Sequence, residues 1–374
     1  MLSLGYGRNL WASLKLSRKE RQYGIIEHKE SEDMKIGIFD ETRRLERLNE
    51  LGDPLIKLNA VVEWEMFRPI LQRVFQKERK GPGGRPAYDY VLMFKILILQ
   101  MLYKLSDDQT EYQINDRMSF MRFLGIGIES RVPDSKTIWL FRETLTKANV
   151  VDELFRLFNA RLEAAELITR TGSIVDATFV DAPRQRNSRE ENEKIKAGEV
   201  PEEWTKPEKV HKLLQKDTDA RWAKKNQETH FGYKDHVKVD AESKLIVSYN
   251  VTSANIHDSQ ALKGLIDEDK VLYADSAYSG KELLESLPEN VKCEVHEKGA
   301  KGHPLTAEQK ESNRVKSKTR VRVEHVFGFM TNSMGGITLR SIGMLRAEFH
   351  IGIRNLVYNL CRYEFLSRPD FAKG

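Results

Sequence analysis

The stretch SIVDATFV, residues 173–180, determines how we expect the C-terminal half of this 374-residue chain to fold. It is rich in β-branched and aromatic residues and partly alternates apolar with polar positions, which predicts a β-strand. Asp176 lies inside this apolar run, where an unpaired charge costs free energy. We therefore expect a partner or a ligand at Asp176.

Downstream of this strand, short apolar segments alternate with helix-like ones. The predicted strands are residues 233–240, 245–252, 270–274 and 291–295, and the predicted helices are residues 258–266 and 308–330. Strands first, followed by alternating helix and strand, indicate a mixed sheet flanked by helices. The predicted fold class is α/β, preceded by an all-α N-terminal domain.

The N-terminal part has helical spacing of apolar residues. Residues 36–78 show this spacing, residues 81–86 form a Gly/Pro loop, and residues 89–105 are apolar almost all round, which is typical of a buried helix. Helices are predicted over residues 106–123 and 133–147, with Trp139, Phe141 and Leu145 on the inner side of the second. This pair is compatible with helix-turn-helix DNA binding or with plain helical packing.

Residues 183–228 are dense in Lys, Arg, Glu, Asn and Gln and contain few apolar residues, which predicts a solvated insertion or arm. Its basic residues are offset by acidic ones. A charged surface is therefore favoured over a dedicated DNA clamp.

Composition narrows the class of protein. The formal net charge of +5 mildly favours a polyanionic partner. Cys293 and Cys361 lie far apart with no Cys/His cluster, so we expect reduced, buried thiols rather than a zinc site or a disulfide. The most hydrophobic run, residues 88–103, contains Lys95 and is too short for a membrane span, and no signal-peptide pattern is visible. A cytoplasmic protein is expected.

Three acidic residues occupy unusual positions. Besides Asp176, Asp275 directly follows the predicted strand 270–274, where open α/β sheets place ligands, and Glu324 lies in a helix among apolar and basic residues. Carboxylate oxygens suit Mg²⁺, and three carboxylates can hold two ions about 3.5–4 Å apart for phosphoryl transfer. The alternatives are an arginine-paired buried acid at Asp176, a helix N-cap at Asp275, and an ion pair of Glu324 with Arg320.

The predicted helix 308–330 is also basic. Arg314, Lys318 and Arg322 form an i, i+4 row, and Arg320 lies near the face of Glu324. Like charges this close repel one another unless an anion such as a DNA phosphate lies against them. The alternative is a solvated basic helix.

Five segments, taken in order, resemble a known family. They are Ser173–Thr178, Gly232–Asp240, Val251–Asp258, Tyr273–Tyr278 and Arg320–Gly328. With Gly84-Arg85-Pro86 and the buried helix upstream, the chain from Phe39 to Phe365 resembles bacterial insertion-sequence transposases of the DDE superfamily, insertion-sequence-five group. Their catalytic domain is RNase H-like.

The resemblance implies that Asp176, Asp275 and Glu324 are the first, second and third metal-binding catalytic acids. Related families also carry tyrosine and lysine near the third acid, whereas this chain has Ser317 and Thr331, which weakens the case for contacts to an end phosphate. His257 and Asp258 match a family motif, but helix capping by Asp258 explains them.

The resemblance also implies an activity and partners. We expect an enzyme that binds the terminal inverted repeats of an insertion sequence and catalyses strand cleavage and strand transfer with Mg²⁺, for which Mn²⁺ substitutes. Its partners would be double-stranded DNA, at transposon ends and target, and a second copy in a homodimer or larger assembly on DNA in the bacterial nucleoid. The alternatives are an inactive transposase-derived DNA-binding protein and a metal-dependent nuclease without strand transfer.

The expected domain plan follows from these observations. It consists of an N-terminal extension (1–37), a helical, DNA-binding domain (38–170), an RNase H-like catalytic domain (171–366) with the polar insertion 183–228, and a C-terminal tail (367–374).

Overall fold

A computed structural model of the chain describes residues 40–76, 86–225, 227–262, 264–265, 270–278, 291–297, 299, 304–336 and 338–368. The chain divides into two compact units, residues 1–52 and 53–374. The first unit contributes helix α1 (Asp40–Leu51), and the second contains every other element named below. The predicted loop at 81–86 lies outside the described residues except for Pro86.

The second unit begins with helices, as the sequence predicts. They are α2 (Pro54–Val61), η2 (Trp64–Phe67), α3 (Arg68–Phe75), α4 (Tyr90–Leu102), α5 (Asp107–Asp116), α6 (Met118–Leu124), α7 (Ser135–Lys147) and α8 (Val151–Ala164). Polar caps fix where three of them begin: Asp89 accepts from Leu92 N, Ser106 forms a capping box with Gln109, and Asp134 accepts from Thr137 N.

Two expectations for this helical part were wrong. The single helix over residues 106–123 is broken at Arg117, whose backbone is extended, because Asn115 and Asp116 favour non-helical conformations. Trp139 does not lie on the inner side of α7, since it is 49% exposed, whereas Phe141 and Leu145 are buried as predicted.

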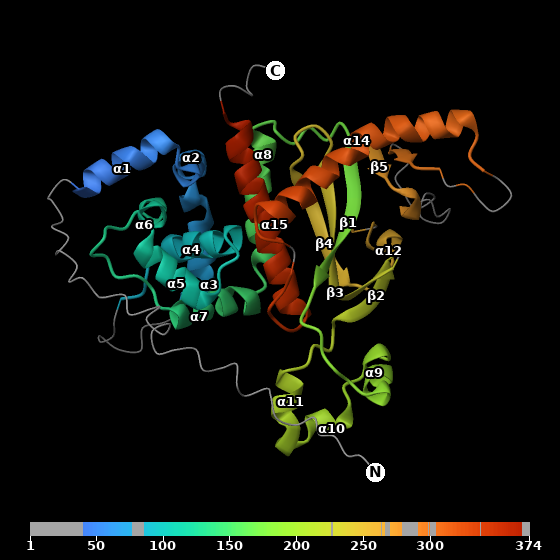
Figure 1. Cartoon of the computed structure of the whole chain (residues 1–374), viewed down its shortest axis with the longest axis horizontal. Coiled ribbons are helices and arrows are strands. Elements are labelled where there is room, and N and C mark those ends of the chain that lie inside the picture. Colours follow the sequence, from blue (N-terminus) through green and yellow to red (C-terminus); the bar gives the residue numbers. More distant parts are fainter. Residues whose placement is uncertain are drawn as a thin grey trace, which may run out of the picture. The chain divides into compact units, whose positions relative to one another are not determined.

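The C-terminal half contains a six-stranded mixed sheet (Figure 1). Its strands are β1 (Ser173–Asp181), β2 (Arg221–Lys225), β3 (Glu228–Asp240), β4 (Ile246–Ser253), β5 (Val271–Ala274) and β6 (Lys292–Val295). The order is β2-β3-β1-β5-β6, and β4 also pairs with β3. β1, β3 and β4 pair antiparallel, while β1, β5 and β6 pair parallel. The expected fold class, a mixed sheet flanked by helices and preceded by a helical region, is confirmed.

The remaining helices follow β1. They are α9 (Arg189–Lys196), α10 (Glu202–Thr205), η3 (Pro207–Lys209), α11 (Val210–Leu214), α12 (Asp258–Leu262), η4 (Ser276–Tyr278), α14 (Ala307–Asn332) and α15 (Met344–Leu366). Helix α15 was not predicted. It packs against α8, α4 and β4 and so joins the helical part to the sheet (Figure 1).

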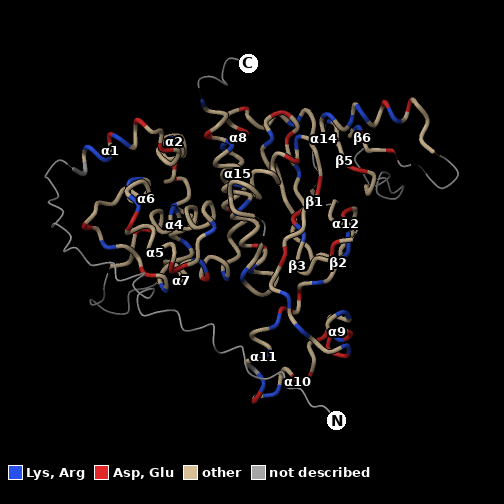
Figure 2. Tube along the Cα trace, in the orientation of Figure 1, with Lys and Arg blue, Asp and Glu red and all other residues tan. Residues whose placement is uncertain are grey.

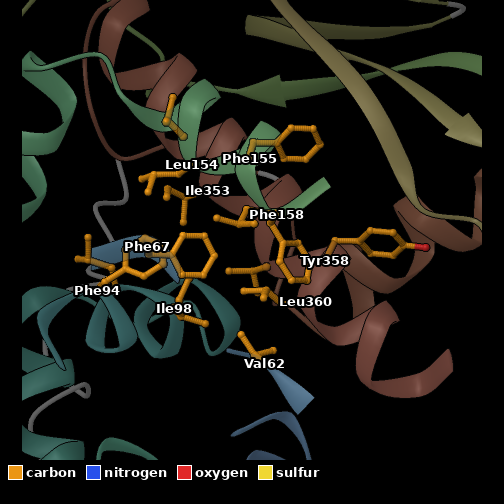
Figure 3. Packing of buried hydrophobic residues seen from close by; sticks show 14 of the residues in the cluster. Val62, Phe67, Phe94, Ile98, Leu154, Phe155, Phe158, Ile353, Tyr358 and Leu360 are labelled. Carbon is orange, nitrogen blue, oxygen red and sulfur yellow. The ribbon is translucent and has the colours of Figure 1, made fainter. Parts of the chain in front are cut away.

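One hydrophobic core runs through both parts. Figure 3 shows Phe67, Phe94 and Phe158 of the helical part converging with Ile353 and Leu360 of α15.

Two buried asparagines complete the contact between α8, α15 and β4. Asn359 of α15 donates to Asn159 and to Ile246 O, and it accepts from Ile246 N at 2.9 Å. Asn159 in turn donates to the carbonyls of Ile246 and Val247. Buried amides are satisfied in this way only if the helices and the strand keep one register.

The insertion 183–228 is not the unanchored arm that its composition suggests. Trp204 is fully buried, Ile195 is also buried, and the indole of Trp204 donates to Glu191 at 2.8 Å. Lys212 pairs with the same carboxylate. The expected offset between its acidic and basic residues therefore takes the form of ion pairs around a small core.

Cys293 and Cys361 are both free, as expected, but both are half-buried rather than fully buried. In the part of the chain that the structure describes, no helix combines the length and the apolarity that crossing a bilayer requires.

Candidate active site

The register of the sheet brings Asp176 and Asp275 side by side. β1 and β5 pair in parallel, with Ile174 opposite Tyr273. Side chains alternate along a strand, so Asp176 and Asp275, each two residues further on, point to the same face as Ile174 and Tyr273. Neighbouring strands lie about 4.8 Å apart. The two acids are therefore neighbours at the carboxyl end of β5.

Helix α14 covers this face and brings Glu324 to it. Val323, Val326 and Met330 of α14 are fully buried, and the helix contacts both β1 and β5. Arg320, one turn before Glu324, donates from Nη1 to Asp176 Oδ2 at 3.2 Å. Glu324 itself is exposed. All three predicted acids thus lie near the carboxyl end of β5, with an arginine between β1 and α14.

The electrostatics of Asp176 show that the three acids affect one another. The side chain is only 16% exposed, and this burial raises the pKa of Asp176 to about 6. A backbone N–H bond from Ala177 and the charge of Arg320 lower this pKa, whereas the charges of Asp275 and Glu324 raise it further. A second cation near Asp176 would relieve this repulsion.

The contacts of Asp176 and Asp275 agree with the structural alternatives for these acids, and those of Glu324 do not. Asp176 does pair with an arginine, and Asp275 accepts from Ala277 N at 2.7 Å at the start of η4, as a capping residue does. Glu324 has no ion pair with Arg320 among the described residues. Capping and pairing occupy part of each carboxylate and leave other oxygen lone pairs available to a ligand.

The donor chemistry of these acids fits a divalent cation, and their mutual repulsion favours one. Across the described ranges, however, no three His, Cys, Asp or Glu side chains are gathered closely enough to hold a metal ion. Arg320 supplies the positive charge beside Asp176 instead. Binding of a metal would therefore require Arg320 to release Asp176 and Glu324 to draw nearer.

Tyr278 lies near the acids, although its pattern in the sequence did not single it out. It is fully buried, and its hydroxyl has no hydrogen-bond partner among the described residues. Burial raises the pKa of Tyr278, and the charges of Asp258, Asp176 and Asp275 raise it further, so the phenol stays protonated and can donate. Its only sequence signal was its place in the segment Tyr273–Tyr278.

A second polar cluster lies around β3. Lys234 donates to Asp258 at 2.8 Å and to Ile256 O at 2.7 Å. The capping expected of Asp258 is supplied by His257 instead, whose Nδ1 accepts from Ser259 N at 3.3 Å. His236 hydrogen-bonds Thr252 at 2.8 Å, and burial lowers the pKa of His236 to about 4, so its ring is neutral at pH 7.

The four basic candidates on α14 do not form one free row. Arg320 contacts Asp176, Arg322 donates to Ala241 O, and Arg314 pairs with Glu311 at 3.3 Å. Lys318 is exposed. Figure 2 shows Lys and Arg positions recurring along α14. Arg314 and Lys318 face solvent, whereas Arg320 is part of the acidic site.

The raised pKa of Asp176 has a consequence for stability. An unfolded aspartate titrates near 3.9, so the folded protein holds an extra proton between that pH and about 6, and its stability falls as pH rises through this window. Above pH 6 we expect Asp176→Asn to unfold with a free energy about 2 kcal/mol larger than the parent. Urea denaturation of both proteins below and above this window measures the difference. If the parent and Asp176→Asn had equal free energies of unfolding both below and above the window, the raised pKa of Asp176 would be contradicted.

Comparison with known proteins gives two family matches. Residues 168–360, just over half of the chain, match the family described as "Transposase DDE domain". Residues 43–144 match "Transposase domain (DUF772)". Asp176, Asp275 and Glu324 all lie within the first match.

One solved structure is similar at low identity. It is the cryo-EM structure of a piggyBac transposase synaptic complex with hairpin DNA, at 11% identity and a TM-score of 0.37 over 84% of this chain and 76% of that one.

Proposed function

This chain belongs to the family of transposases with a DDE domain, and from that premise we propose that it binds the terminal inverted repeats of an insertion sequence, cleaves the strand there and joins the freed end to target DNA. We place it in the insertion-sequence-five group on its five quoted segments. The observation that carries the proposal is the pair Asp176 and Asp275 on neighbouring strands, with Glu324 close enough to raise the Asp176 pKa.

DDE transposases generally use divalent metal ions, and here we propose Mg²⁺, with Mn²⁺ as a substitute, held by Asp176, Asp275 and Glu324. Bound there, the ions would activate a water or a 3′-hydroxyl and stabilise the departing oxygen of the phosphodiester. Tyr278 would donate a hydrogen bond to one of the acids.

Arg320 has a defined part in this proposal. In the structure its guanidinium neutralises Asp176. With metal held by the carboxylates, Arg320 would be free to contact a DNA phosphate, because the guanidinium suits bidentate contact with phosphate oxygens. The pairing with Asp176 thus keeps a buried acid compensated until substrate is present.

DNA would lie along α14. Arg314 and Lys318 reach solvent, and Arg322 uses its Ala241 contact while keeping further N–H donors available. We propose these three and Arg320 as contacts to the sugar-phosphate backbone, which position the duplex without reading its sequence. We propose that the helical domain, residues 38–170, recognises the sequence of the repeat. The catalytic domain comprises residues 171–366. Bringing two ends together requires at least a dimer on DNA.

The test is strand cleavage of a labelled duplex that carries the element's own terminal repeat. We expect a nick at the repeat boundary in Mg²⁺, none in EDTA, and none in a duplex of the same composition with the repeat scrambled. Cleavage irrespective of the repeat would indicate a nuclease. Binding without cleavage in either Mg²⁺ or Mn²⁺ would indicate a DNA-binding protein that has lost the activity.

A further inference from the structure

A cavity of about 510 Å³ lies away from the acidic site, where the helical part meets the start of α15. Its walls come from the end of α4, the start of α5, one side of α7, the segment 338–342 and the first half of α15. The side chains that give it its character are basic. They are Lys104, Arg142, Arg340, Arg346 and Arg354.

Two of these cations are neutralised within the wall. Arg142 makes two hydrogen bonds to the carboxylate of Asp107, and Arg346 makes two to Glu143, at 3.0 and 2.7 Å. Such bidentate pairs hold the guanidinium groups in fixed positions. Among the described residues that line this cavity, Asp107 and Glu143 are the only acidic ones.

The other three cations form no ion pair among the described residues, although the charge of the buried Asp235 carboxyl raises the pKa of Arg354 against the larger effect of burial. Lys104 donates to a backbone carbonyl, that of Gly335. Lys104, Arg340 and Arg354 line the same cavity. Burial lowers the pKa of Lys104, and the charges of Arg354 and Arg340 lower it further. Like charges gathered this closely repel one another unless an anion lies between them.

Arg354 gives the strongest indication of a ligand. Its side chain is buried, at 6% relative exposure, yet its Nε and Nη1 donors have no hydrogen-bond partner within the described part of the chain. The hydroxyl of Ser341, in the same wall, is also unpartnered. Leaving charged donors buried and unpaired is costly, so native structures normally supply a partner. Burial lowers the pKa of Arg354 to about 10, so it remains charged at pH 7.

We propose that this cavity binds a phosphate group, with Arg354, Arg340 and Lys104 as its cationic partners and Ser341 as a hydroxyl donor. A phosphate offers several acceptor oxygens and carries one negative charge as a diester or about two as a monoester, which suits three cations in one cavity wall and two unpartnered guanidinium donors. A carboxylate would leave more of these donors unused. The site is separate from Asp176, Asp275 and Glu324.

The size of the cavity indicates that the phosphate arrives on a larger molecule. Its volume falls in the range typical of small-molecule sites. Trp139 lines the same cavity and is half exposed, so its ring is available for a base to stack on. The ligand class is therefore a nucleotide unit, whether it belongs to a DNA strand or is free.

The experiment uses the full-length protein and three variants. Arg340→Ala removes an exposed cation of the cavity, and Arg354→Met removes the buried one. Arg156→Ala is the matched control, since Arg156 is an exposed arginine outside this cavity. One arm measures the dissociation constant for inorganic phosphate from thermal shifts, against chloride at equal ionic strength. The other arm measures the salt dependence of binding to a short labelled duplex of arbitrary sequence.

We expect saturable phosphate binding in the parent and in Arg156→Ala, with a dissociation constant at least about tenfold higher in Arg340→Ala and Arg354→Met. If only a DNA phosphate fits, inorganic phosphate will not bind. In that case Arg340→Ala will make the slope of log K against log salt for the duplex about 0.9 less steep, whereas Arg156→Ala will leave it unchanged.

The proposal is overturned if Arg340→Ala and Arg156→Ala have the same phosphate affinity and the same salt dependence of duplex binding. This comparison holds even if Arg354→Met fails to fold. The DNA arm rests on the proposed function and the phosphate arm does not. A parent that never cleaves DNA would therefore remove the transposase assignment without changing the phosphate result.

Discussion

Replacing Asp176, Asp275 or Glu324 with alanine should lower the rate of DNA strand cleavage by at least about 10²-fold. Changes to groups that only support metal ligands already cost about 10–100-fold, and the loss of a ligand should cost more. Duplex affinity should change little, because it resides in basic side chains such as Arg314 and Lys318. Cleavage kinetics and fluorescence anisotropy on the same duplex separate the two quantities.

The control for this series is Glu308→Ala. Glu308 is an exposed acid in the first turn of α14, and Glu324 lies 16 residues further along the same helix. The Glu308→Ala variant should cleave DNA at the same rate as the parent. Equal losses in Glu308→Ala and Glu324→Ala would mean that net charge on α14, rather than a metal site, governs the reaction. Loss of duplex binding in all three acid variants would also count against the assignment.

Gly232→Ala should destabilise the fold by about 3–5 kcal/mol. Gly232 has φ +152°, and an added Cβ would lie 2.2 Å from Val180 O and 2.7 Å from Ala182 N. Both neighbours are backbone atoms at the end of β1 and cannot move without breaking its pairing with β3. The free energy of unfolding in urea, or loss of soluble protein, measures the effect.

Gly328→Ala is the matched control for this substitution. Gly328 lies inside α14, and an added Cβ there would have no atom within 4 Å. Alanine favours helix over glycine by about 1 kcal/mol, so this variant should be slightly more stable than the parent. If both glycine variants changed the free energy of unfolding by the same amount, the close approach of the β1 backbone could not be the reason that position 232 requires glycine.

The three acids could be singled out as candidates from the sequence because each lies in a strongly patterned segment. Residues 173–180 are apolar enough that Asp176 stands out, and Asp275 ends a short buried strand. What the pattern could not give is the partner. Arg320 lies 144 residues from Asp176 along the chain, and only the packing of α14 across the sheet brings them together. The alternative that paired Arg320 with Glu324 considered only contacts within the helix.

Helix α15 was missed for a related reason. It is buried on nearly every side, so it has no single apolar face, and its buried polar residues Arg354, Asn355 and Asn359 interrupt the pattern. The hydrogen-bond partners of such residues lie far away in the sequence, as Ile246 does for Asn359. The prediction put Trp139 on the inner side with Phe141 and Leu145, yet α7 packs through Ile138, Phe141 and Leu145. Periodicity gives the face of a helix only approximately.

Strand transfer tests the central claim most directly, because it separates a transposase from a nuclease and from a DNA-binding protein. A labelled duplex that ends in the terminal repeat with a free 3′-hydroxyl is incubated with the full-length protein and a supercoiled plasmid in Mg²⁺. We predict that the label becomes covalently joined to the plasmid, and that EDTA or Glu324→Ala prevents joining while the duplex is still bound. Binding of the duplex with no joined product in Mg²⁺ or Mn²⁺ would contradict the account.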